Sequence, residues 1–334
     1  MSARIEDLLD PSSLPDPTTD VRLIQTHISM VLVGDDFVYK IKKPVDFGFL
    51  NFSTLELRGH YCREEVRLNQ RLSEDIYLGV IPVTRDKGRD RLGGSGETVD
   101  YAVRMRRIPE QRLMRYLYER GELKEHHLKR VARVLADFHL KAARSPTIDN
   151  FGHWENFKVN TDENFEQTAP YIGRTIDSQD YAEIKRWTED FFKGYSELFE
   201  ERVSSGRIRD CHGDLHMEHI CLLDEEKVAV IDCIEFNDRF RYTDILADIA
   251  FLLMDLEFRG GYEAAGCLWR AYAEPACESG MERLLTFYKV YRAYVRGKVI
   301  GFQLDDQGVS PTARDEAAVV AGKYFALARS YIEE

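Results

Sequence analysis

The stretch of residues 211–232 constrains the fold of this chain more than any other. It begins with Cys-His-Gly-Asp-Leu-His-Met-Glu-His over residues 211–219. Two short apolar runs follow, at 220–223 and 228–231, and the polar link Asp-Glu-Glu-Lys joins them. Short apolar runs on either side of a short polar link are typical of a β-hairpin. We therefore expect a hairpin that returns Asp232 to the neighbourhood of the His-Gly-Asp turn.

The register of this hairpin can be predicted from its spacing. A loop centred in the polar link would place Leu223 opposite Val228 and His219 opposite Asp232. Residues directly opposite each other in an antiparallel pair have Cβ atoms about 5 Å apart and share a face. Two metal-capable groups would then meet at one end of the hairpin, and Asp214 would enter from the loop just upstream. A carboxylate for a metal ion beside a carboxylate for a hydroxyl group is the arrangement of phosphoryl transfer.

These residues resemble the aminoglycoside phosphotransferase (choline kinase-like) branch of the protein-kinase-like fold, and the resemblance covers nearly the whole chain. The segments that carry it are 36–44, 64–72, 212–219, 231–237 and 248–256. The last two also resemble a bacterial group of uncharacterised kinases of this family, in which the kinase domain is often fused to a P-loop ATPase domain. No P-loop sequence occurs here, so we expect the kinase domain to stand alone.

The resemblance implies two catalytic residues in the His-Gly-Asp turn. Asp214 would orient the acceptor hydroxyl and take its proton, and His212 would shape the loop by hydrogen bonding. The alternative for Asp214 is a turn aspartate that caps its own backbone. In the segment after the turn, Asp232 would bind Mg²⁺ or Mn²⁺ together with His219. The family usually has Asn at position 219, and the imidazole nitrogen suits softer ions than magnesium.

The resemblance also implies an ATP site in the first third of the chain. Lys40 would hold the phosphates of ATP, with Glu65 as its helical partner and Glu64 as the alternative. Lys42 shares the strand face of Lys40, because side chains alternate along a strand, and the alternative for both is a solvated face. Met105 and Arg107 belong to the predicted hinge 105–109, whose backbone groups would pair with adenine. The phosphate-covering loop would fall at about residues 25–29, which contain no glycine.

Four further residues are candidates for binding the substrate. Glu235 and Asn237 follow the metal-binding aspartate and would reach a hydroxyl or amine. Arg292 and Arg296 are one helical turn apart and would clamp an anionic substrate. The alternative for these arginines is pairing with the carboxylates of this acidic protein.

The order of predicted elements indicates an α+β fold with two lobes. The first lobe, residues 1–107, is predicted to hold strands within 21–43, 76–84 and 98–106, and a helix from a capping box at Ser53 to Leu72. The second lobe, residues 108–334, is predicted to be mostly helical, and a ligand cleft would lie between the lobes. The helices expected there cover residues 109–119, 125–143, 181–203, 243–257, 261–278, 281–303 and 312–332.

Composition limits the partners and the compartment. The chain has 334 residues and a net charge of −12, which argues against non-specific binding to nucleic acid. We find no signal peptide and no apolar run of membrane-spanning length, and the six cysteines lack metal-site spacing, so we expect a cytoplasmic protein with mostly buried thiols.

The sequence therefore predicts an ATP-dependent kinase that acts on a hydroxyl of a small molecule. A nucleotide-binding pseudokinase with a regulatory or scaffolding role is the alternative, and a kinase with a macromolecular substrate is a third possibility. The identity of the acceptor, the choice between ATP and GTP, and the oligomeric state stay open.

Overall fold

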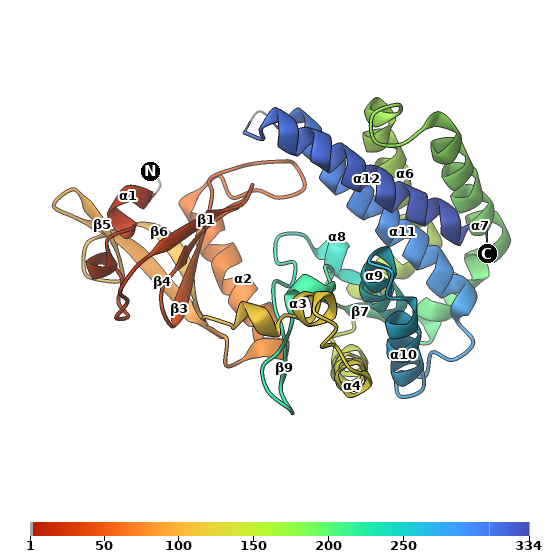
Figure 1. Cartoon of the computed structure of the whole chain (residues 1–334), viewed down its shortest axis with the longest axis horizontal. Coiled ribbons are helices and arrows are strands. Elements are labelled where there is room, and N and C mark those ends of the chain that lie inside the picture. Colours follow the sequence, from red (N-terminus) through yellow and green to blue (C-terminus); the bar gives the residue numbers. More distant parts are fainter. Residues whose placement is uncertain (1–2, 307, 334) are drawn as a thin grey trace. The chain divides into compact units, whose positions relative to one another are not determined.

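The computed structural model describes residues 3–306 and 308–333 (Figure 1). Contacts within the chain define two compact units. Unit 1 consists of Met1–Glu122 and Glu218–Asp238, and unit 2 of Leu123–Met217 and Arg239–Glu334. Unit 1 is built around a sheet with one long helix and unit 2 is mostly helical, so the predicted α+β class is confirmed. The lobe boundary at residue 107 stays a prediction.

The sheet of unit 1 is antiparallel throughout, with the strand order β1-β2-β3-β6-β4-β5. Its strands are β1 (Arg22–Gln25), β2 (Ser29–Val33), β3 (Phe37–Lys42), β4 (Tyr77–Asp86), β5 (Arg89–Leu92) and β6 (Glu97–Arg106). The segment 21–43, in which strands were predicted, breaks twice, at a turn around Gly34 and also after Gln25. The second break forms because the hydroxyl of Thr26 accepts hydrogen bonds from the N–H groups of Ile28 and Ser29.

Helix α2 (Leu55–Ser73) packs against this sheet. Its N-cap is Thr54, whose hydroxyl accepts from the N–H of Leu57 at 3.2 Å, so the predicted cap at Ser53 is one residue early. The buried face of α2 carries apolar Cys62 and Leu68, and it also carries the carboxylate of Glu65. Burial of an acidic side chain on the face that meets the sheet requires a cationic partner there.

The hairpin of unit 1 consists of β8 (Ile220–Leu222) and β9 (Val228–Val230). Leu222 pairs with Val228, so the predicted pairing of Leu223 with Val228 is wrong by one residue. The loop is one residue longer than predicted, because the carboxylate of Asp224 accepts the N–H groups of Glu226 and Lys227 and closes a turn inside it. A one-residue shift moves side chains to the opposite face, so facing positions no longer bring His219 to Asp232.

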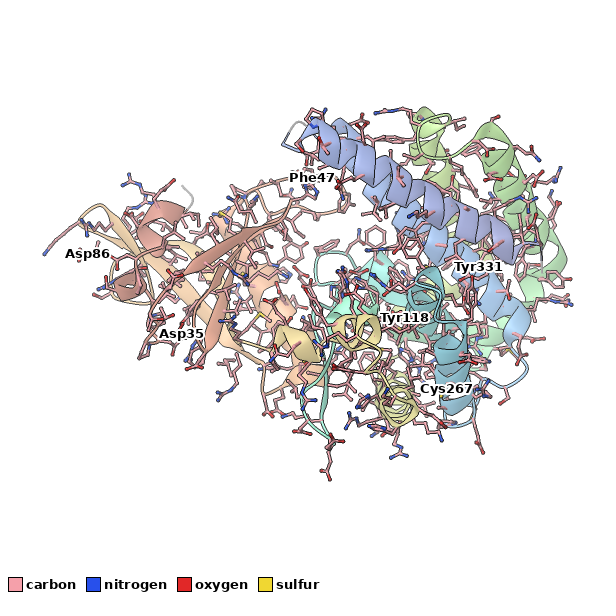
Figure 2. All side chains as sticks on the ribbon, in the orientation of Figure 1. Asp35, Phe47, Asp86, Tyr118, Cys267 and Tyr331 are labelled. Atoms are coloured by element: carbon pink, nitrogen blue, oxygen red, sulfur yellow. The ribbon has the colours of Figure 1, made fainter. Side chains whose placement is uncertain are left out.

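The remaining elements of unit 1 are short. The helix expected over 109–119 is interrupted at Leu113, which lies between a 3₁₀ turn and α3 (Met114–Glu119). The other short elements are α1 (Ile5–Leu8) and 3₁₀ turns at Pro11–Ser13, Glu110–Arg112 and Met217–His219, the last of which begins at the end of unit 2. Phe47 lies in the loop between β3 and α2 and is exposed (Figure 2).

Unit 2 is a helical assembly in which α11 packs against both α9 and α12 (Figure 1). Its helices are α4 (Glu125–Lys141), α5 (Pro146–Asp149), α6 (Trp154–Thr168), α7 (Ser178–Ser204), α9 (Ile245–Phe258), α10 (Tyr262–Ala273), α11 (Glu282–Gly301) and α12 (Pro311–Tyr331), with α8 (Asp238–Arg241) at the junction with unit 1. Two short strands, β7 (Ile208–Asp210) and β10 (Tyr242–Asp244), pair antiparallel, and 3₁₀ turns cover Asn150–Gly152, Ala169–Tyr171 and Phe302–Asp305. The sequence predicted the long helices and missed α6 and the β7–β10 pair.

The six cysteines are free thiols. Four are buried as predicted, Cys267 on α10 is partly buried (Figure 2), and Cys277 is exposed. Over residues 3–306 and 308–333, no helix combines the length and apolar character that crossing a membrane requires.

Candidate functional site

Asp232 follows β9 in a left-handed backbone conformation, with φ of +64°. Its N–H donates to the hydroxyl of Tyr77 at 3.0 Å, which holds this uncommon conformation in place. The turn directs the carboxylate toward the beginning of β8, where Oδ2 lies 3.5 Å from Nε2 of His219. The two residues predicted to bind the metal ion are therefore neighbours, although the prediction that they pair directly across the hairpin is wrong.

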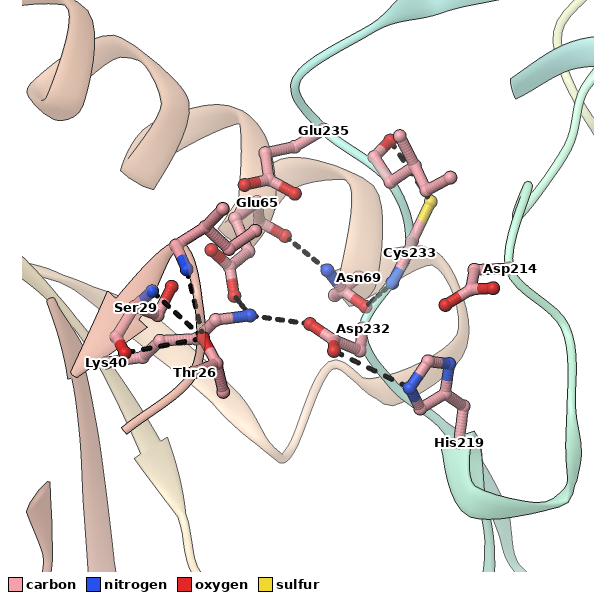
Figure 3. A network of polar contacts seen from close by, with 12 residues as sticks. Thr26, Ser29, Lys40, Glu65, Asn69, Asp214, His219, Asp232, Cys233 and Glu235 are labelled. Atoms are coloured by element: carbon pink, nitrogen blue, oxygen red, sulfur yellow. Dashed lines mark hydrogen bonds and ion pairs between the residues drawn. The ribbon is translucent and has the colours of Figure 1, made fainter. Parts of the chain in front are cut away.

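Lys40 connects Asp232 to α2 (Figure 3). Its Nζ lies 2.5 Å from Oδ1 of Asp232 and 2.9 Å from Oε1 of Glu65. Burial alone would lower the pKa of Lys40, but the charges of Asp232 and Glu65 outweigh burial and raise it well above its ordinary value. The lysine is therefore held as a cation between two carboxylates, and Glu65, not Glu64, is its helical partner.

A second lysine shares the same glutamate. Nζ of Lys42 lies 2.6 Å from Oε2 of Glu65 and in direct contact with the carboxylate of Glu235. Side-chain exposure is 1% for Lys42, 0% for Glu65 and 5% for Glu235. The solvated face considered for Lys42 is therefore wrong. The carboxylate of Glu235 is buried against Lys42, and its expected contact with a substrate stays a prediction. Alternation along β3 was the one sequence signal that put Lys40 and Lys42 on one face.

Several hydrogen bonds fix the segment after β9 to α2. The hydroxyl of Ser73 donates to the carbonyl of Val230 at 2.7 Å, and the side-chain oxygen of Asn69 accepts the N–H of Cys233 at 2.9 Å. The amide of Asn69 donates to the carbonyl of Glu65 at 2.8 Å. The position of Asp232 is thus set by the helix that carries Glu65.

The other candidate residues of unit 1 make hydrogen bonds with the backbone of the same unit. Met105 pairs in β6 with strands on both sides, and the N–H of Arg107 donates to the carbonyl of Asp36 at 2.8 Å. Because this N–H is used inside the unit, the expected pairing with a nucleotide base does not hold for it. The amide of Asn237 donates to the carbonyl of Phe49 at 3.0 Å.

In unit 2, the His-Gly-Asp turn is anchored by a buried aspartate of α9. Asp248 accepts the N–H of His212 through Oδ2 and the N–H of Gly213 through Oδ1, each at 2.9 Å. His139 of α4 lies 3.1 Å from Oδ2. Burial would raise the pKa of Asp248, but hydrogen bonding and charge from His139 outweigh it, and the pKa falls below its ordinary value. An ionised carboxylate therefore holds the backbone of this turn.

The same helix holds the far end of the loop. Asp255, two turns after Asp248, is buried and accepts the N–H of Met217 at 3.0 Å. Between these anchors the side chain of Asp214 is 33% exposed, and its Oδ2 lies 3.5 Å from Nε2 of His216. His212 is buried, and its Nδ1 accepts the N–H of Asp214 at 3.3 Å, so it shapes the turn as predicted. The side chain of His216 is buried as well.

The two arginines of α11 have separate environments. Arg292 is buried and donates to the carbonyls of Ala247 and Gly213 at 2.9 and 3.0 Å, and its charge helps to lower the pKa of Asp248. Its role as a substrate clamp stays a prediction. Arg296, one turn later, lies over the ring of Tyr324 at 5.7 Å. Burial would lower the pKa of Arg296, but Tyr324 and the charge of Asp214 raise it. The charge of Asp214 therefore acts on Arg296.

Residues 60–284 match the sequence profile of a family described as the phosphotransferase enzyme family. The chain belongs to this family. It is 33% identical over 318 residues to uncharacterised proteins of Mycobacterium tuberculosis and Mycobacterium bovis, and the alignment covers 95% of this chain and 60% of each relative. The chain thus spans about 60% of the length of these relatives.

Two solved structures share the fold. The choline/ethanolamine kinase family protein from Mesorhizobium loti has a TM-score of 0.54 at 15% identity, covering 94% of this chain and 93% of that one. The GDP complex of aminoglycoside 2'-phosphotransferase-IIIa has a TM-score of 0.53 at 14% identity, covering 93% and 94%. The predicted kinase-like α+β fold is thereby confirmed.

Proposed function

We propose that this phosphotransferase moves the γ-phosphate of ATP to a hydroxyl group of a small molecule. The observation that carries the proposal is the position of Lys40, which contacts both Glu65 of α2 and Asp232 at the end of the hairpin. A lysine paired with a helical glutamate, beside an aspartate that can hold a metal ion, is the phosphate-binding arrangement of kinases.

Asp232 and His219 carry oxygen and nitrogen atoms that can bind a divalent cation. The carboxylate of Asp232 is 44% exposed and offers oxygen, which Mg²⁺ prefers, while His219 beside it offers nitrogen, which Mn²⁺ accepts more readily. Asp232 would hold the ion, and His219 would shift the preference toward manganese. When bound, the cation neutralises charge on the phosphates of the nucleotide.

Asp214 is proposed as the group that accepts the proton. The acceptor hydroxyl would donate to a carboxylate oxygen of Asp214, its oxygen would attack the γ-phosphorus, and the bond to the β-phosphate oxygen would break to release ADP. The proton ends on Asp214. Asp248 supports this role because it fixes the two N–H groups immediately before Asp214.

A nucleotide-binding pseudokinase is the second candidate, and the observation that favours it is the imidazole of His219 at the metal-binding carboxylate.

The longer mycobacterial relatives support placing the chain in the bacterial group whose kinase domain is often joined to an ATPase domain.

A phosphorylation screen tests the proposal. Wild type and the variants Asp214→Asn and Lys40→Met would be incubated with ATP and a library of small hydroxylated metabolites, once with Mg²⁺ and once with Mn²⁺. Phosphorylated products would be detected by mass spectrometry. The proposal requires a product that forms with wild type and is lost in both variants. ATP binding by wild type without any product would favour the pseudokinase.

A further inference from the structure

We propose that Lys42 is a positioning residue: it is the permanent counter-ion of Glu65 and leaves Lys40 free to move from the carboxylates to the phosphates of a nucleotide. The inference rests on the proposed function. It assigns different tasks to two lysines that occupy the same face of β3.

The geometry separates the two lysines at the level of single oxygens. Glu65 presents Oε1 to Lys40 at 2.9 Å and Oε2 to Lys42 at 2.6 Å. Departure of Lys40 therefore leaves the contact at Oε2 intact. A glutamate with a single lysine partner would lose its entire counter-charge at that step.

Burial makes this second contact necessary. The side chain of Glu65 is fully buried, and a buried carboxylate without a cation is strongly unfavourable. Lys42 is equally inaccessible, whereas Lys40 is 16% exposed and its other partner, Asp232, is 44% exposed. The lysine at the accessible edge can exchange partners, and the lysine in the interior cannot.

The local charges favour the same division. The cluster contains two lysines and three carboxylates, namely Lys40, Lys42, Glu65, Asp232 and Glu235. Without Lys40, a divalent cation at Asp232 would neutralise that carboxylate, and Lys42 would still serve the two buried ones. Lys42 thus holds the inner half of the cluster together while the outer half exchanges Lys40 for a metal ion.

Glu235 gives Lys42 a fixed position. It contacts Lys42 from the segment after β9, and the centroid of the Phe52 ring lies 4.8 Å from the lysine Nζ. This contact joins the segment that carries Asp232 to β3, and the hydrogen bond from Cys233 to Asn69 joins the same segment to α2. Lys42 therefore acts on the nucleotide through Glu65, Lys40 and the position of Asp232.

The test compares four variants by thermal unfolding and by calorimetric titration with ATP. They are Lys40→Met, Lys42→Met, the double variant Lys42→Met with Glu235→Gln, and the exposed control Lys227→Met, which removes a lysine paired with Asp75. Lys40→Met should leave the melting temperature close to that of wild type, because Glu65 keeps Lys42. Lys42→Met should lower the melting temperature by several degrees, and Lys227→Met should change neither property.

The double variant is decisive because it removes the buried pair without leaving Glu235 charged. Its melting temperature should recover most of the decrease seen in Lys42→Met. Its dissociation constant for ATP should nevertheless be about tenfold or more above that of wild type, since Lys40 must then remain with Glu65. A double variant that binds ATP as tightly as wild type would overturn the inference. So would a Lys40→Met variant that melts as early as Lys42→Met.

The readouts also separate this inference from the proposed function. Absence of phosphate transfer in wild type, with the expected pattern of melting temperatures and ATP affinities, would reject the catalytic function and keep the division between the lysines. Absence of ATP binding in wild type would reject both.

Discussion

Replacing Asp248 by Asn should destabilise unit 2 and slow phosphate transfer at the same time. The change keeps the shape of the side chain and removes its charge. The wild-type carboxylate uses one oxygen for the N–H of Gly213 and the other for the N–H of His212. An amide has one oxygen, so in either orientation its NH₂ group must face one of these donors.

The magnitude follows from those contacts. Loss of one hydrogen bond to a charged group costs about 1.5–3 kcal/mol, and a buried donor left without an acceptor costs about 1–3 kcal/mol more. We expect a loss of about 3–5 kcal/mol in the free energy of unfolding, in the range for breaking a buried ionic network. Displacement of Asp214 should lower kcat by about 10²-fold, the effect of a shift of about 1 Å in a catalytic group.

The assays are urea unfolding and steady-state kinetics at a temperature where the variant remains folded. Asp137→Asn on the exposed face of α4 is the matched control and should change stability by less than about 0.5 kcal/mol. Because the pKa of Asp248 lies below its ordinary value of about 4, its stabilisation is complete above that pH and is lost as the pH falls further. A loss below about 1 kcal/mol at neutral pH, or unchanged kcat, would refute the anchoring role.

Three further outcomes follow from the site and the core. Wild type should be more active with manganese than with magnesium, and His219→Asn should reverse this order; an unchanged ratio of the two rates would remove His219 from the metal site. Arg296→Met should raise KM for the acceptor identified by the screen by about tenfold, a loss of about 1.4 kcal/mol, if the acceptor is anionic, with KM for ATP unchanged. Equal acceptor KM values in variant and wild type would exclude an anionic group at that arginine. Arg202→Met should reduce the free energy of unfolding by about 3–5 kcal/mol, because it leaves Asp244 buried without the guanidinium of Arg202 and Glu278 with only the longer contact to Arg207; a change below about 1 kcal/mol in urea unfolding would contradict this.

The parts of the site that follow local periodicity were predictable from the sequence. Alternation along β3 placed Lys40 on the same face as Lys42, and the helix predicted up to Leu72 contained Glu65, the partner that the resemblance implied. Both residues lie in long regular elements, whose phase is set by many neighbouring side chains. Their meeting with Asp232 followed from the family resemblance.

The parts that depend on turn geometry or on distant pairs were not predictable. The carboxylate of Asp224 closes a turn that lengthens the hairpin loop by one residue, and the left-handed backbone of Asp232 redirects its side chain toward His219. Neither leaves a periodic signal. The contact between Lys42 and Glu235 joins residues 193 positions apart, so the burial of both charges becomes visible only when the strand and the segment after β9 are folded together.

The most direct measurement of the central claim compares transfer and nucleotide binding in Asp214→Asn. If Asp214 accepts the proton of the acceptor hydroxyl, the variant should lose about 10²-fold or more of the transfer rate. Its dissociation constant for ATP, measured by calorimetry, should stay within about threefold, because Lys40, proposed to bind the phosphates, and Asp232, proposed to bind the metal ion, are untouched; a threefold change is below 1 kcal/mol. Transfer at the wild-type rate in a folded Asp214→Asn protein would contradict the account.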